Sequence, residues 1–151
     1  MPFRRETRLL PYTAEQMYAV VADIEQYPEF LPWCSKLVIL KREWKWRVEL
    51  VTAEMFITYQ AFSETYVSLV KLDAPALMIE ASHVEGPFKR LDTRWRFVPL
   101  AQGSEINFLI DFAFKNALLS AIAGVAFRRV AAKMQEAFIS RAEALYGLPV
   151  A

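Results

Sequence analysis

The segment from Glu105 to Phe114 constrains the fold of this chain more than any other part of its sequence. Large apolar side chains occupy every second position from Ile106 to Phe114, and Glu105, Asn107 and Asp111 stand between them. Successive side chains of a β-strand point to opposite faces of a sheet, so this alternation predicts a strand with one buried face. A buried sheet face needs a second layer of structure to cover it.

The residues after this strand predict the covering layer. Asn116 can cap a long helix, and Gly147 and Pro149 are expected to end it. Apolar residues recur along this helix every three or four positions, which is typical of one buried face. They are Leu119, Ile122, Ala126, Val130, Met134, Ala137, Phe138 and Leu145. The opposite, solvated face carries Arg128, Arg129, Lys133, Glu136, Arg141 and Glu143.

The earlier part of the chain predicts one short helix and several strands. Phe3 to Leu10 has the pattern of a strand, and Thr13 to Gln16 forms a capping box that predicts the start of a helix. After Cys34 the apolar period becomes two, in the runs Leu37 and Ile39, then Trp44, Trp46, Val48 and Leu50, then Tyr66, Ser68, Val70 and Leu72. Turn signals bound two further strands, near Leu77 to Val84 and Leu91 to Val98.

Strands without βαβ alternation form an antiparallel sheet. We therefore predict an α+β fold of the helix-grip type. A curved antiparallel sheet wraps around the long C-terminal helix, with one or two short helices after the first strand. Such a fold commonly leaves a space between sheet and helix that holds apolar ligands.

Composition and charge limit the classes of function. The 151 residues fit one domain, 1–151, and the hydrophobic share of 55% is enough to fill a core and line a cavity. A net charge of +1 gives no general attraction for DNA. The apolar run from Ala117 to Phe127 is too short to span a bilayer, and no signal peptide follows Met1. We expect a cytoplasmic protein.

No set of residues predicts catalysis or a metal site. His83 is the single histidine and has no partner at metal-ligand spacing, and the single cysteine, Cys34, is expected to be a small core residue. Asp92, Asp111 and Glu64 lie in alternating strands, where solvated positions explain them. Sequence motifs for phosphate loops, zinc proteases and serine hydrolases are absent. We therefore expect a protein that is not an enzyme.

Two aromatic segments remain. In residues 86–97, strand alternation separates the rings from the basic side chains and explains the segment without RNA binding. In residues 27–34, two prolines bracket Phe30 and Leu31, with Tyr27 before them and Trp33 after. This second segment is either a loop packed on the core or a rigid apolar gate over a cavity.

These segments carry a family resemblance. Tyr27 to Cys34, then Gly86 to Leu91 followed by Trp95 to Phe97, then Asp111 to Phe114 and Met134 to Phe138 resemble the coenzyme Q-binding protein family of START-like, polyketide cyclase-like domains. The resemblance implies a single START-like lipid-binding domain that carries ubiquinone without catalysis and supports respiratory electron transport. Ubiquinone would be the bound ligand, with no catalytic cofactor. The same family includes bacterial toxins that inhibit ribosome association through the large subunit, and the fold includes small polyketide cyclases or aromatases. Both remain alternatives.

On this reading the ligand site combines the helix face, the inward strand residues and the proline-bracketed loop. The expected cavity and portal residues are Tyr27, Phe30, Leu31, Trp33, Tyr66, Phe88, Trp95, Phe97, Phe108, Ile110, Phe112, Leu119, Ile122, Ala126 and Val130. Tyr66, Thr93 or Asn107 would supply donors for a polar headgroup if they face inward. Phe30, Leu31, Trp33 and Phe88, beside Lys89 and Arg90, are expected to touch the membrane surface transiently, with the protein peripheral at the inner membrane.

Overall fold

The computed structural model describes residues 3–59 and 62–147 and confirms the predicted fold class. Its elements, in chain order, are β1 (Phe3–Leu10), α1 (Ala14–Ala22), a 3-10 turn η1 (Ile24–Gln26), α2 (Tyr27–Phe30), β2 (Cys34–Lys45), β3 (Val48–Tyr59), β4 (Phe62–Asp73), β5 (Met78–Glu85), β6 (Phe88–Leu100), β7 (Gly103–Phe114) and α3 (Ala117–Tyr146). The predicted residue Pro149 lies outside the described residues.

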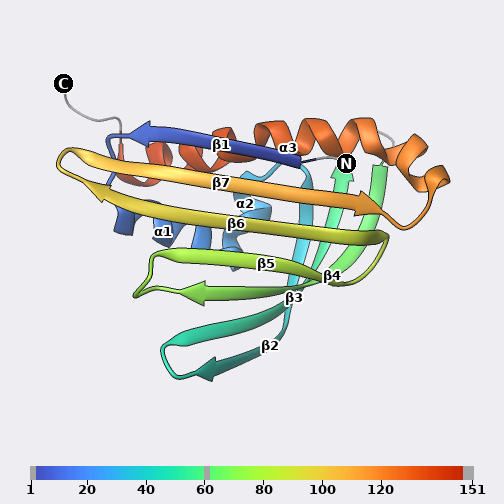
Figure 1. The fold of residues 1–151 in the computed structure, drawn as a ribbon, viewed down its shortest axis with the longest axis horizontal. Helices are drawn as coiled ribbons and strands as arrows, with labels where there is room; N and C mark the ends of the chain where they lie inside the picture. The colour runs from blue at the N-terminus through green and yellow to red at the C-terminus, as the bar shows by residue number, and fades with distance from the viewer. Residues whose placement is uncertain (1–2, 60–61, 148–151) are drawn as a thin grey trace.

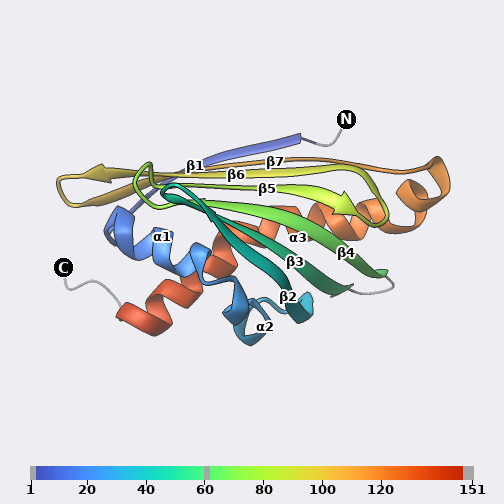
Figure 2. The same cartoon turned by 90° about the horizontal axis from the view of Figure 1, so that it is seen from below.

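The strands form one antiparallel sheet in the order β1-β7-β6-β5-β4-β3-β2. Register shifts interrupt the β2–β3, β4–β5 and β6–β7 pairings, and such bulges bend strands. Figure 2 shows the result: the sheet arches, and α1, α2 and α3 all lie on its concave side (Figures 1 and 2). The core therefore sits between one sheet face and the helices.

Local sequence signals place the helices. Thr13 and Gln16 form both bonds of the capping box, and the Asn116 side chain accepts from the Leu119 backbone N–H at the start of α3. At its other end α3 is tied to the N-terminal part of the chain, because the Tyr12 hydroxyl donates to the Gly147 carbonyl over 2.9 Å. The long helix is therefore fixed across the sheet rather than attached at one end.

The inward face of α3 differs from the prediction by one residue at its start, and the predicted Leu145 is exposed near its end. Ala123, Phe127, Val130 and Phe138 are buried, whereas Ile122 is 62% exposed. Each helical residue advances about 100° around the axis. Placing Ile122 rather than Ala123 on the buried face therefore turns the start of the predicted apolar face toward solvent. The large ring of Phe127, which packs at 4.7 Å between ring centroids on Phe112, fixes the observed rotation.

The predicted alternation through Trp44, Trp46, Val48 and Leu50 is wrong. β2 ends at Lys45 and pairs with Val48, so Trp46 lies in a two-residue turn rather than inside a strand. Trp44 and Trp46 are 67% and 89% exposed. The alternation was real in the sequence but continued across a turn that carries neither glycine nor proline, the usual signals of one.

Within the described part of the chain, no helix is both long and apolar enough to cross a membrane.

Candidate ligand-binding cavity

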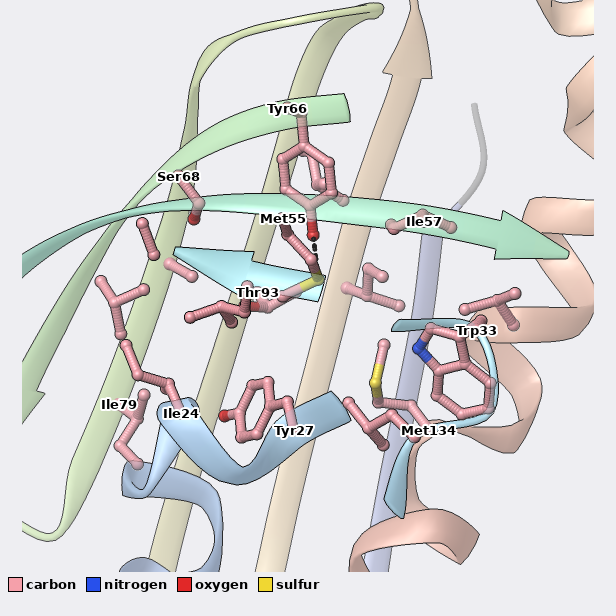
Figure 3. Close-up of a pocket in the computed structure, with 18 of the residues that line it drawn as sticks. Ile24, Tyr27, Trp33, Met55, Ile57, Tyr66, Ser68, Ile79, Thr93 and Met134 are labelled. Atoms are coloured by element: carbon pink, nitrogen blue, oxygen red, sulfur yellow. Dashed lines mark hydrogen bonds between the residues drawn. The ribbon is translucent and has the colours of Figure 1, made fainter. Parts of the chain in front are cut away.

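An apolar cavity of about 90 Å³ lies between the concave sheet face and the helices α2 and α3 (Figure 3). Strands β2 to β7 supply most of its wall, α2 and the segment after it close one side, and α3 closes another. The lining residues are Ile24, Tyr27, Leu31, Trp33, Leu37, Ala53, Met55, Ile57, Tyr66, Ser68, Val70, Ile79, Ala81, Leu91, Thr93, Trp95, Phe108, Ile110, Phe127, Val130, Met134 and Phe138. Among these described lining residues there is no acidic, basic or histidine side chain.

Hydroxyl groups are the main polar feature of this wall. Tyr66 and Ser68 extend from β4 and Thr93 extends from β6, and Figure 3 shows the Tyr66 ring pointing into the space beside them. The Tyr66 hydroxyl donates to the Met55 sulfur over 3.4 Å. Thioether sulfur is a weak acceptor, so this donor is only weakly satisfied. Burial raises the pKa of Tyr66 above its usual value, which keeps the hydroxyl protonated.

Tyr27 has a structural partner for its hydroxyl. It donates to the Val21 carbonyl and thereby ties α2 to the end of α1. Burial raises its pKa as well. Its ring meets Phe138 edge-on at 5.3 Å between centroids. Tyr27 therefore presents mainly its ring to the cavity, whereas Tyr66 offers a hydroxyl.

Aromatic rings form one end of the cavity. Trp95 lies 4.4 Å from Phe108 and 5.0 Å from Phe138, measured between ring centroids. These contacts join β6, β7 and α3. Flat rings in this arrangement favour a flat apolar ligand, because stacked and edge-to-face contacts add to the burial of apolar area.

About half of the residues predicted for the site line the cavity. They are Tyr27, Leu31, Trp33, Tyr66, Trp95, Phe108, Ile110 and Val130. Phe30 lies in an outer groove, and Phe97, Phe112 and Ala126 are buried elsewhere in the core. Leu119 is half-buried against the core, and Ile122 faces solvent. The helix contributes to the cavity through its middle, because its first turns cover a different part of the sheet.

Phe88 is not a portal residue. It is 1% exposed and packs on Phe114 and Phe127, with centroids 4.9 Å and 5.0 Å away. The expectation that it touches a membrane is therefore wrong, because its ring is part of the aromatic cluster beneath the first half of α3. The neighbouring Arg90 forms a bidentate ion pair with Asp111, at 3.0 Å and 3.1 Å, on the outer face of the sheet.

Trp33 separates the cavity from an outer groove. The groove lies between α2 and the second half of α3, and both Trp33 and Phe30 line it. Trp33 and Leu31 are buried, so neither presents itself directly to a membrane. The structure thus shows residues 27–34 packed on the core, with Trp33 as the wall between inner cavity and outer groove. Whether Trp33 also acts as a gate is a prediction.

Three other polar side chains lie outside the cavity: Asn107, which was expected as a headgroup donor, Cys34, which was expected in the core, and His83. The Asn107 side chain accepts a hydrogen bond from Thr7 and donates one to Glu105, so it does not serve as the headgroup donor that the sequence predicted. The Cys34 thiol is buried, and burial raises its pKa to about 11, which disfavours the reactive thiolate. His83 stacks behind Tyr66 at 6.4 Å, and burial lowers its pKa.

The prediction missed the cavity wall contributed by β3 and two lining residues of α3, Phe127 and Met134. Ala53, Met55 and Ile57 alternate along β3, and Phe127 and Met134 follow the helical period on α3. Both signals were present in the sequence. Alternation identifies a buried face, but it does not say which buried residues border empty space and which fill the core.

Comparison with known proteins identifies relatives over nearly the whole chain. The family model for polyketide cyclases, dehydrases and lipid transport matches residues 10–139. Ribosome association toxin RatA from Escherichia coli is 37% identical over 147 residues, covering 97% of this chain and 90% of that protein. The coenzyme Q-binding protein COQ10 homolog B, mitochondrial, from Xenopus laevis is 33% identical, covering 94% of this chain and 58% of that protein.

Solved structures share the fold. An 18 kDa protein from Caulobacter crescentus has a TM-score of 0.79 and 35% identity, with 98% of this chain and 100% of that chain covered. The Zhui aromatase/cyclase from Streptomyces also has a TM-score of 0.79, with 97% and 99% covered, but only 18% identity. The second likeness establishes a common fold and does not extend to activity.

Proposed function

Because this chain belongs to the family of polyketide cyclases, dehydrases and lipid-transport proteins, we propose that it binds ubiquinone or a related isoprenoid quinone in its cavity and carries it without chemical change. The Tyr66 hydroxyl is the observation that supports this most directly. Among the described residues, this buried, protonated donor has only the Met55 thioether sulfur as its hydrogen-bond partner. A quinone carbonyl oxygen is a far better acceptor than the Met55 sulfur. A bound quinone that accepts the Tyr66 hydrogen bond in place of Met55 is therefore favoured.

The lining favours a carrier over an enzyme. General acid–base catalysis needs a group that titrates near the working pH, usually a histidine or a carboxylate. The described lining residues include neither, and the pKa values of Tyr27 and Tyr66 are raised rather than lowered. The name of the relative COQ10 homolog B as a coenzyme Q-binding protein supports the choice of quinone.

An isoprenoid tail suits a protein that exchanges ligand with a membrane. Each buried CH₂ contributes about 0.8 kcal/mol relative to water, whereas its transfer between two apolar environments changes the free energy little. An apolar cavity can therefore hold such a tail against water and still return it to a bilayer.

The cavity has to widen to admit this ligand. Its volume of about 90 Å³ is well below the roughly 300–1,000 Å³ of typical ligand sites. Met55 and Met134 line it, and methionine side chains adapt readily because they are unbranched and have three rotatable bonds. We propose that these two side chains withdraw when the quinone ring occupies the space beside Tyr66.

Mass spectrometry of organic extracts from the purified protein tests the proposal. Ubiquinone should be enriched relative to extracts of a Val130→Gln variant, whose amide would occupy the cavity wall, purified at equal folded concentration. Absence of quinone from the extracts, together with no uptake of added ubiquinone, would refute it.

Association with the large ribosomal subunit is a second candidate function. Its specific support is the 37% identity to ribosome association toxin RatA over 97% of this chain. Cosedimentation of the protein with purified large subunits in a sucrose gradient distinguishes it. Saturable binding there, with no quinone bound in the cavity, would favour this second function over the first.

A further inference from the structure

The β2–β3 turn carries two exposed tryptophans that the cavity does not use. We call residues Trp44, Lys45, Trp46 and Arg47 the tryptophan turn. Figure 1 shows this turn at the lower edge of the molecule, and in both Figures 1 and 2 it lies far along the long axis from the start of α3. Trp46 is 89% exposed and Trp44 is 67% exposed. Indole rings are costly to leave in water, so packing within the chain does not account for them.

Trp46 is also held in an unfavourable backbone conformation. Its φ is 60°, and among the described non-glycine residues only Leu77 shares a positive φ. Trp46 is the first central residue of a two-residue hairpin turn, between the paired residues Lys45 and Val48. A positive φ at that position is typical of a turn that normally takes glycine. A bulky residue in this conformation at an exposed site indicates that its side chain serves a purpose other than folding.

The charges at the tip differ from those behind it. Lys41 pairs with Glu43 at 3.3 Å, and Arg42 pairs with Glu25 and Glu49 at 2.6 Å and 3.0 Å. Lys45 and Arg47 form no ion pair with any described residue, and the Arg47 guanidinium lies 5.2 Å from the centre of the Trp46 ring. The tip therefore combines indoles with two uncompensated cations, whereas the strands behind it are electrically balanced.

We infer that the tryptophan turn docks onto an anionic lipid bilayer. Indoles prefer the interfacial layer of a membrane, and lysine and arginine next to them attract anionic headgroups. A flat layer of lipid headgroups would contact only the tip of the turn and not the strands behind it. A nucleic acid would need many more cations and would run past Glu43 and Glu49, so the charge pattern favours the bilayer. The docking uses no ligand in the cavity and can be tested separately from quinone binding.

Cosedimentation with vesicles tests this docking. Vesicles of phosphatidylcholine and phosphatidylglycerol in equal parts should bind the full chain, added salt should weaken the binding, and vesicles of phosphatidylcholine alone should bind little. Trp46→Gly should lower partitioning about tenfold while raising the urea midpoint of unfolding, because glycine suits the turn and removes the indole. Lys45→Gln combined with Arg47→Gln should lower partitioning roughly thirtyfold.

A matched control removes exposed apolar groups at the far end of the molecule. Leu118 and Ile122 are exposed on the first turns of α3, and Leu118→Ala combined with Ile122→Ala should leave vesicle binding unchanged. The inference is overturned if the parent does not bind anionic vesicles, if Trp46→Gly binds as the parent does, or if the α3 control loses binding instead. It is also overturned if the turn variants lose affinity for purified ribosomal subunits but keep full vesicle binding.

Discussion

Two tyrosines in the cavity wall differ in the partners of their hydroxyl groups, and this difference separates binding from stability. Tyr66 donates to the Met55 sulfur, whereas Tyr27 donates to the Val21 carbonyl. We predict that Tyr66→Phe lowers ubiquinone affinity roughly five- to tenfold, because it removes a hydrogen bond of about 1 kcal/mol to the quinone. Its free energy of unfolding should change by less than about 0.5 kcal/mol. Fluorescence titration with ubiquinone and urea unfolding measure the two quantities.

Tyr27→Phe is the matched control for that experiment. It removes the same atom from the same cavity but leaves the Val21 carbonyl without its tyrosine donor. Unfolding free energy should fall by about 1–2 kcal/mol, with little change in quinone affinity. If both variants lose affinity equally, the headgroup does not contact Tyr66 specifically.

The rotation of α3 can be tested with single carboxylates. Ile122 faces solvent, so Ile122→Asp should change the free energy of unfolding by less than about 0.5 kcal/mol and leave ligand binding intact. Val130 lies 1% exposed in the cavity wall, so Val130→Asp should cost at least about 3 kcal/mol, because it buries a charge without a partner. Chemical denaturation followed by circular dichroism measures both, and the reverse order of effects would contradict the observed helix face.

At the scale of elements, the sequence predicts those whose signals are local. The capping box at Thr13, the cap at Asn116 and the alternation in β7 are confirmed because neighbouring residues alone determine them. The β2–β3 turn escaped prediction because Trp46 adopts a conformation that sequence rules reserve for glycine. The facing of α3 escaped because Ile122 is much more apolar than Ala123, so the pattern favoured Ile122 as the buried residue. The contacts of the Phe127 ring with Phe112 and Phe114 instead turn Ala123 inward.

Two glycines should respond in opposite ways to alanine. A Cβ atom added at Gly103, at the start of β7, would lie 2.0 Å from the Leu10 carbonyl oxygen, and the φ of 142° is itself unfavourable for alanine. A Cβ at Gly124, within α3, would meet no neighbouring side chain closer than 3.7 Å. We predict that Gly103→Ala destabilises the protein by at least about 2 kcal/mol, whereas Gly124→Ala stabilises it by about 0.5–1 kcal/mol.

Thermal unfolding of the two alanine variants tests this pair. The melting temperature should fall for Gly103→Ala and rise for Gly124→Ala. A rise for both would mean that β1 and the β6–β7 turn do not approach as closely as the structure shows.

At the scale of the whole molecule, the cavity arises where α2 and α3 fail to fill one part of the concave sheet face completely. Trp33 from the loop, Trp95 from β6 and Val130 from α3 come from distant parts of the sequence and meet there. Periodicity identified Trp95 and Val130 as buried, whereas Trp33 was expected in a segment either packed on the core or gating a cavity. It could not place Phe88 and Phe112 in a solid aromatic cluster and Phe108 beside open space, because that distinction depends on the volume left after all neighbours have packed.

The four tryptophans allow a direct test of ligand location. Trp33 and Trp95 line the cavity, whereas Trp44 and Trp46 lie on the exposed turn. In a Trp44→Phe, Trp46→Phe variant, all indole fluorescence comes from the cavity wall. Titration of this variant with ubiquinone in detergent should give saturable quenching of most of the emission, and Tyr66→Phe in the same background should shift the curve to higher concentration. Quenching that disappears with the two turn tryptophans would place the quinone outside the cavity and contradict the proposed function.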